Sequence, residues 1–90
     1  MYMYKLSPEE RQIYIMLELI ANPHYTTMHR FAEELYVSRI TIMSDIDAVK
    51  QILIPSDAEL LLDSGKGIKL SCSYEASLEL LVSLYKKIAA

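Results

Sequence analysis

The side chains best suited to chemistry lie between Ser38 and Ser44, in the stretch SRITIMS. It carries a guanidinium at Arg39, hydroxyls at Ser38, Thr41 and Ser44, and an apolar side chain, Ile40, at an outward position of the predicted helix. Guanidinium and hydroxyl groups donate hydrogen bonds to phosphate oxygens and base edges, and an apolar side chain can contact a thymine methyl. The pattern therefore predicts contact with double-stranded DNA rather than catalysis.

Three further residues extend this predicted set of DNA contacts. Thr27 and Arg30 open the preceding helix and can reach the phosphate backbone, and Lys66 stands at the tip of a glycine-rich turn. Each candidate also has an ordinary structural interpretation. Arg39 can pair with Glu34, Lys66 can be a solvated turn lysine, and an isolated exposed apolar side chain needs no function at all.

Several neighbouring residues are better explained by structure than by contact with a ligand. Asp45 is expected to bond nearby backbone or to pair with Arg30 or His29, and Met43 is expected to pack on the flank of its helix. Cys72 ends an inward-facing strand and is predicted to be a buried small hydrophobic residue.

No set of residues supports an enzyme, a metal site, a cofactor or a small-molecule site. The sequence lacks a phosphate-binding loop, a nucleophile elbow and a metal motif, and its single cysteine excludes an internal disulfide. No run of about 18 apolar residues is present, and the first ten residues do not resemble a signal peptide. We therefore expect a cytoplasmic protein that does not enter a membrane.

The overall charge opposes DNA binding unless the charges are segregated. The 90 residues carry a formal charge of -3 and have a pI near 5.3, whereas most DNA-binding modules are basic. The acids are predicted to gather on the first and last helices and the bases on the middle of the chain, which would leave a local positive field. The bases in question are Arg30, Arg39, Lys50, Lys66 and Lys69.

Local signals predict three helices in the first 54 residues. The first begins with a Ser7 cap and a Glu10 capping box and ends at Asn22-Pro23, and Tyr25-Thr26 can form a very short strand. The second follows Thr27 over residues 28–36, and the third follows Ser38 and ends before Pro55. Helical spacing predicts inward residues at Ile13, Met16, Leu17 and Ile20; at Met28, Phe31, Ala32 and Leu35; and at Ile42, Ile46, Val49 and Leu53.

A hairpin and a fourth helix complete the predicted fold. Residues 58–72 are predicted to form the hairpin, and alternation places on its inner face Leu60, Leu62, Ile68, Leu70 and Cys72. Gly65 and Gly67 are expected to supply the positive φ of the turn, and Lys69 is expected on the solvent face. The helix over 73–88, capped by Ser73, has a wide apolar stripe at Tyr74, Leu78, Leu81, Val82, Tyr85 and Ile88, with Leu80 and Leu84 beside it. Such a stripe suits a homodimer, through Leu78, Leu81, Val82 and Tyr85, or a further domain.

These elements predict a mainly α fold with a small β-hairpin. The order is that of a winged helix-turn-helix, with a three-helix core, a wing and a C-terminal helix. We expect one domain over residues 1–90, with the helix-turn-helix at about 27–53, the wing at about 58–72 and the dimerising or linking helix at about 73–88.

At this point the sequence resembles a known family. The pattern Leu35-x-Val37-Ser38-x-x-Thr41-Ile42-x-x-Asp45-Ile46, followed by G-K-G-I-x-L from Gly65 to Leu70, is similar to the N-terminal winged-helix domain of bacterial regulators with PTS regulation domains. These are the mannitol- and lichenan-operon-activator type, often labelled transcriptional antiterminator, and the Mga-like regulators are similar. The resemblance implies operator binding as part of a dimer, control of carbohydrate genes, and excision from a longer regulator.

Two points qualify the resemblance. True antiterminators of that group bind RNA through a small β-rich domain, which this sequence does not resemble, so RNA is not expected. Members of the group often carry an arginine or lysine among the outward positions of this helix near Ile40 or Ser44, and this chain has neither at those positions. A winged helix that binds protein rather than DNA therefore stays open as the alternative.

Overall fold

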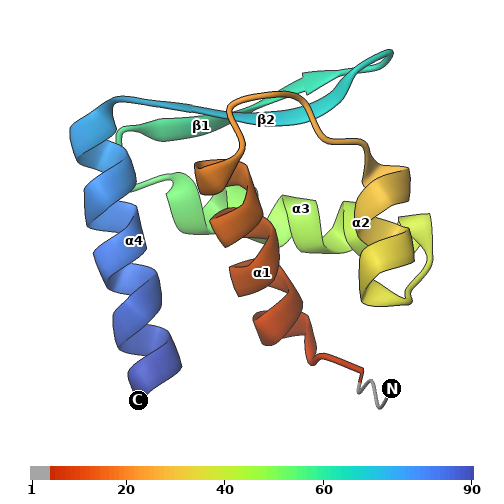
Figure 1. Ribbon diagram of the computed structural model, residues 1–90, viewed down its shortest axis with the longest axis horizontal. Helices are drawn as coiled ribbons and strands as arrows, with labels where there is room; N and C mark the ends of the chain where they lie inside the picture. Colours follow the sequence, from red (N-terminus) through yellow and green to blue (C-terminus); the bar gives the residue numbers. More distant parts are fainter. Residues whose placement is uncertain (1–4) are drawn as a thin grey trace.

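The computed structural model describes residues 5–90 and contains, in that range, four helices and one hairpin. The order is α1 (Pro8–Ala21), α2 (Met28–Leu35), α3 (Arg39–Leu53), β1 (Ala58–Asp63), β2 (Gly67–Cys72) and α4 (Tyr74–Ala89). The hairpin lies along one side of the helices, and α1 and α4 run beside each other away from it (Figure 1). The predicted winged helix-turn-helix, mainly α with a small hairpin, is confirmed.

Helix α1 begins where the capping box predicts and buries a different face. The Ser7 hydroxyl accepts from the Glu10 N–H at 3.2 Å, and the Glu10 carboxylate accepts from the Ser7 N–H at 2.7 Å. Of the predicted inward residues only Met16 is buried; the others are half-buried, and Arg11, Ile15 and Leu19 are buried instead. The prediction was wrong there because α1 lies between two apolar clusters.

The first cluster joins α1 to the helix-turn-helix. It contains Ile15, Leu19, Phe31, Ala32, Leu35, Ile42, Ile46 and Ile68. The second joins α1 to the end of α3 and to α4, through Met16, Val49, Leu53, Leu80 and Leu84, with Ile13, Leu17 and Ile20 packed against it. The predicted inward stripe of α3, which is Ile42, Ile46, Val49 and Leu53, is buried throughout and is confirmed.

The turn between α2 and α3 is short because one residue adopts a left-handed conformation. Tyr36 has φ 58° and ψ 43°, and the Val37 N–H donates to the Ala32 carbonyl at 3.1 Å. Ser38 then caps α3 by accepting from the Thr41 N–H at 3.1 Å. The chain thereby reverses into the next helix within three residues, as the helix-turn-helix prediction requires.

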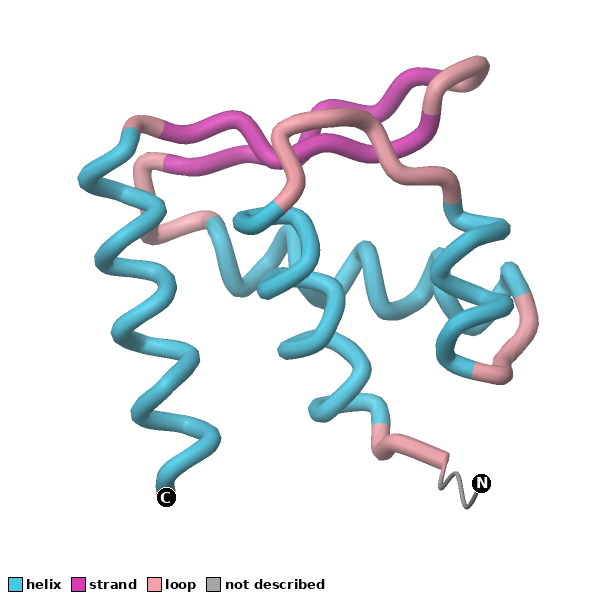
Figure 2. The backbone as a smooth tube through the Cα atoms, in the orientation of Figure 1, coloured by secondary structure: helices cyan, strands magenta, loops and turns pink. Residues whose placement is uncertain are grey.

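The hairpin is held to the helices by the segment before α2. Thr26 and Ile68 exchange two backbone hydrogen bonds of 2.8 Å each, and this isolated bridge joins the loop before α2 to the two-stranded hairpin, which the loop passes in Figure 2. Gly67 has φ +111°, and a Cβ there would lie 2.3 Å from the Thr26 carbonyl oxygen. Gly65 has no positive φ, so only one of the two glycines serves the predicted purpose.

Three side chains of the hairpin differ from their predicted burial. Leu62 is exposed although its cross-strand partner Ile68 is fully buried, and Lys69 is half-buried rather than on an open solvent face. Cys72 is half-buried rather than buried. Inner-face alternation holds only where the hairpin lies over the core, at Ile68 and partly at Leu60 and Leu70.

Helix α4 packs with a narrower face than predicted. Ala76, Leu80 and Leu84 are buried, and Ser73 caps the helix by accepting from the Ala76 N–H at 3.1 Å. Leu81 is half-buried, and the rest of the predicted stripe is exposed: Tyr74, Leu78, Val82, Tyr85 and Ile88. None of the helices described between residues 5 and 90 has both the length and the apolar character needed to cross a membrane.

Candidate nucleic-acid interface

A groove separates the start of α3 from the wing, and we call it the recognition groove. One wall is the start of α2 and α3, and the other is the tip of the hairpin. Of the predicted contact residues, Thr27 and Arg39 line it, and Lys66 belongs to the turn at its wing side. The lining also contains Met28, His29, Met43, Leu62, Asp63, Ser64, Gly65 and Gly67.

Arg39 is available for a ligand. The side chain is exposed, and within residues 5–90 it forms no ion pair. Its predicted alternative partner, Glu34, instead accepts from the Arg30 Nε at 3.2 Å and from the Tyr14 hydroxyl at 3.1 Å. Burial, and then the bond to Glu34, raises the pKa of Tyr14 to about 12. The interpretation of Arg39 as an ion-pair partner of Glu34 was therefore wrong.

The remaining predicted contacts on α3 divide into two groups. Ser38 and Thr41 bond each other through their hydroxyls at 3.0 Å while Ser38 caps the helix, so both already serve the local structure. Ile40 and Ser44 are exposed on the outward surface. Met43 is 52% exposed and lines the groove, which overturns its predicted role in flank packing.

Helix α3 is held in place by a buried ion pair that the sequence reasoning missed. Asp45 is 2% exposed, and its carboxylate accepts from the Arg11 Nε at 2.7 Å and from the Arg11 Nη2 at 3.3 Å. A third Arg11 nitrogen donates to the Leu6 carbonyl at 3.1 Å. The predicted partners of Asp45, Arg30 and His29, pair instead with acids on α2. Helical spacing alone could have flagged Arg11, which lies one turn before the buried Ile15.

The wing carries two cations arranged around one aromatic ring. The Lys66 and Lys69 ammonium nitrogens each lie 5.7 Å from the centre of the Tyr25 ring, within the range of a cation–π contact. Tyr25 is brought there because the next residue, Thr26, pairs with Ile68. Neither Tyr25 nor Lys69 was among the predicted contacts, and the signal available was the predicted short strand at Tyr25-Thr26.

The tip of the wing is ordered by an exposed acid, Asp63, whose side chain bonds the backbone of the turn. One oxygen of Asp63 accepts from the Gly65 N–H at 2.8 Å and from the Lys66 N–H at 2.9 Å. This carboxylate oxygen therefore stabilises the turn. It orients the backbone that presents Lys66 beside the recognition groove.

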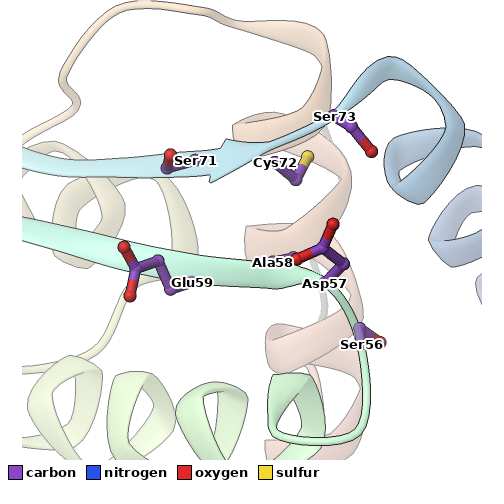
Figure 3. A pocket seen from close by; sticks show the side chains of 7 residues that line it. All are labelled: Ser56, Asp57, Ala58, Glu59, Ser71, Cys72 and Ser73. Carbon is purple, nitrogen blue, oxygen red and sulfur yellow. The ribbon is translucent and has the colours of Figure 1, made fainter.

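A second hollow, at the root of the hairpin, has a different character. Its walls are Ser56, Asp57, Ala58, Glu59, Ser71, Cys72 and Ser73 (Figure 3). Burial, and then the charge of Asp57, raises the pKa of the Cys72 thiol. A thiol with a raised pKa is a weak nucleophile at neutral pH, so the hollow does not present an activated cysteine.

Comparisons with known proteins agree with this geometry. The family profile described as the Mga helix-turn-helix domain matches residues 1–73. Over 48 residues the chain is 42% identical to the "Probable licABCH operon regulator" of Bacillus subtilis (strain 168). That segment is 53% of this chain and 8% of the relative, so the chain spans a small part of the relative's length. The resemblance drawn from the sequence is confirmed.

Proposed function

The chain belongs to the family of Mga helix-turn-helix domains, and on that premise we propose that it binds operator DNA in a sequence-specific manner. The proposed setting is the N-terminal module of a regulator of carbohydrate uptake or metabolism genes. The carbohydrate assignment draws on the name of the Bacillus relative and on the resemblance to PTS-linked regulators. The single observation that carries DNA binding is the open recognition groove, with the exposed Arg39 on one side and Lys66 on the other.

The proposed complex uses the two walls of the groove differently. The first turns of α3 enter the major groove, where Arg39, Ile40 and Ser44 reach base edges or phosphates. The wing lies over the adjacent backbone or minor groove with Lys66. Thr27 and Arg30 contact the backbone from α2, and Ser38 and Thr41 offer phosphates the capped start of α3.

Several acids near the recognition groove are bonded to other groups, which weakens their repulsion of DNA phosphates. Asp45 is buried against Arg11, and Glu34 is bonded to Arg30. The Asp63 carboxylate accepts two backbone N–H groups of the turn. An acid engaged in this way repels phosphate less than a free one, so the local field at the groove can be positive under a net charge of -3.

We also propose that a second copy of the chain docks on α4. The exposed residues Leu78, Val82 and Tyr85, with the half-buried Leu81, form an apolar stripe. Helix α4 lies at the opposite end of the molecule from the tip of the wing (Figure 1), so a dimer formed there leaves both recognition grooves open. Two linked modules bind two half-sites with much greater affinity than one.

Sedimentation equilibrium tests the dimer. Val82→Glu adds a charge to a position that is 53% exposed, so the chain should stay folded while the dimer dissociates. Ser83→Glu, one residue further on the exposed surface, is the matched control. Dimers of unchanged strength in Val82→Glu would exclude this interface.

The DNA-binding proposal is tested by selecting duplexes from a random pool and titrating the best by fluorescence anisotropy at several salt concentrations. Arg39→Ala and Lys66→Ala should weaken binding and each make the salt slope shallower by about 1. Lys86→Ala removes the same charge on α4 and should change neither quantity. If all three variants bind the duplex as tightly as the unmodified chain and with the same salt slope, the recognition groove is not the contact surface.

A protein-binding winged helix is the second candidate. It is favoured by the net charge of -3 and by Ile40 and Met43, which are 78% and 52% exposed. The same titration separates the two functions. A duplex bound with strong salt dependence supports the DNA reading, and failure to select any duplex supports a protein partner.

A further inference from the structure

The outward surface at the start of α3 is unusually apolar for a surface that meets DNA. Ile40 is 78% exposed and Met43 is 52% exposed, three positions apart and so neighbours on the helix. Across the recognition groove the wing presents Leu62, which is 48% exposed. Single exposed apolar residues are common, but here Met43 and Leu62 line one groove and Ile40 lies beside Met43 on the helix.

Building on the DNA-binding function proposed above, we propose that Ile40 and Met43 read the 5-methyl groups of thymine at two neighbouring base pairs. The thymine methyl is the apolar group that a standard base pair presents in the major groove. Neither side chain can donate a hydrogen bond to guanine or pair with adenine. Discrimination at these two positions therefore comes from burying a methyl group against an apolar side chain.

The spacing of the two residues fits adjacent base pairs. Three residues of α-helix advance by roughly 4.5 Å, at 1.5 Å per residue. Successive base pairs on one strand are separated by about 3.4 Å. Two flexible side chains at that separation reach consecutive bases rather than the same one.

The surroundings of the apolar pair favour DNA over a protein as its occupant. Arg39 precedes Ile40 and Ser44 follows Met43, so donors for phosphates and base edges flank the apolar residues on the same helix. Lys66 adds a cation at the wing side of the groove. Phosphates attract these cations, so the charge that surrounds the apolar pair matches DNA.

Thymine-to-uracil substitution provides the test, because it removes the methyl group and keeps every hydrogen-bonding group of the base. In the selected duplex each thymine is replaced in turn, and affinity is measured by anisotropy. Two neighbouring positions should lose about fourfold each, which corresponds to about 0.8 kcal/mol for one buried carbon group. Ile40→Ala should abolish the thymine preference at one position and Met43→Ala at the other.

Ile54→Ala is the matched control. It also shortens an exposed apolar side chain, but at the C-terminal end of α3, away from the recognition groove and the α4 stripe, so it should keep the full thymine preference. Tight duplex binding with equal affinity for thymine and uracil at every position would overturn this inference and leave the DNA-binding function intact. If no duplex binds, both fail, and Ile40 and Met43 belong to a protein-binding surface.

Discussion

Replacing Arg11 with methionine tests how the recognition helix is held. The change keeps an unbranched apolar stem and removes the guanidinium, so the Asp45 carboxylate, which is 2% exposed in the native fold, loses its charged partner. Within residues 5–90 the other side-chain bond to this carboxylate comes from Gln12 at 3.4 Å, which is long for a charged group. Breaking a buried pair from one side costs about 3–5 kcal/mol. That is a large share of the roughly 5–15 kcal/mol that stabilises a domain of ordinary size.

Urea unfolding followed by circular dichroism measures this loss. Arg30→Met is the matched control, since the same substitution there breaks an exposed pair with Glu34, at a cost of about 0.5 kcal/mol or less. In the double variant Arg11→Met/Asp45→Leu no charge is left buried, so most of the lost stability should return. The three measurements separate the cost of an unpaired charge from the loss of the pair itself.

Two outcomes would refute this reasoning. If Arg11→Met loses no more stability than Arg30→Met, the Asp45 carboxylate is reached by water and the ion pair does not hold α3. If the double variant is as unstable as Arg11→Met alone, the loss arises from packing around the arginine stem rather than from the stranded charge.

Two further predictions concern the hairpin and α1. Gly67→Ala should destabilise the chain by about 1–3 kcal/mol or more, because φ is +111° and the added Cβ would meet the Thr26 carbonyl oxygen at 2.3 Å. Gly65→Ala is the control and should be nearly neutral, because the atom nearest to its added Cβ lies at 3.5 Å. The urea unfolding midpoints of the two variants test the difference. Folding raises the pKa of Tyr14 from 10.0 to about 12, so the stability from its neutral form is fully present below pH 10 and is lost as the pH rises towards 12. Tyr14→Phe should remove that alkaline loss in unfolding curves, and an unchanged loss would assign it to another group.

The sequence predicted the helix starts well because a cap depends on residues within three positions of one another. Ser7, Thr27, Ser38 and Ser73 each accept from a backbone N–H three residues later, as expected. The order of elements follows from these caps, from the prolines and from the glycine-bearing turn. Local chemistry was therefore sufficient for the architecture.

Which face of a helix is buried could not be predicted where both faces are apolar. Helix α4 buries Leu80 and Leu84 and exposes Leu78 and Val82, although all four are apolar. Helical spacing groups such residues but does not say which group meets the core, because that depends on where the other elements pack.

The sequence named candidate contacts but not the residues that hold them in place. Arg39 lines the groove and Lys66 belongs to the turn beside it, and their contact with DNA stays a prediction. The partner of Asp45 is 34 positions away at Arg11, and the ring beside Lys66 belongs to Tyr25, 41 positions before it in the chain. Local patterns can flag Arg11 or Tyr25 singly, but which residue each one contacts depends on the finished fold.

The contacts that hold the wing and α3 in place affect how much of the proposed DNA binding comes from charged groups and how much from uncharged ones. The wing is tied to the segment before α2 and α3 is tied to α1, so little ordering remains to oppose binding. Among the proposed contacts, the cations that form no ion pair within residues 5–90 are Arg39 and Lys66, which corresponds to a salt slope of about -2 for one module. A slope that shallow leaves a large part of the specific affinity to uncharged contacts, and at the start of α3 those contacts are made by Ile40 and Met43.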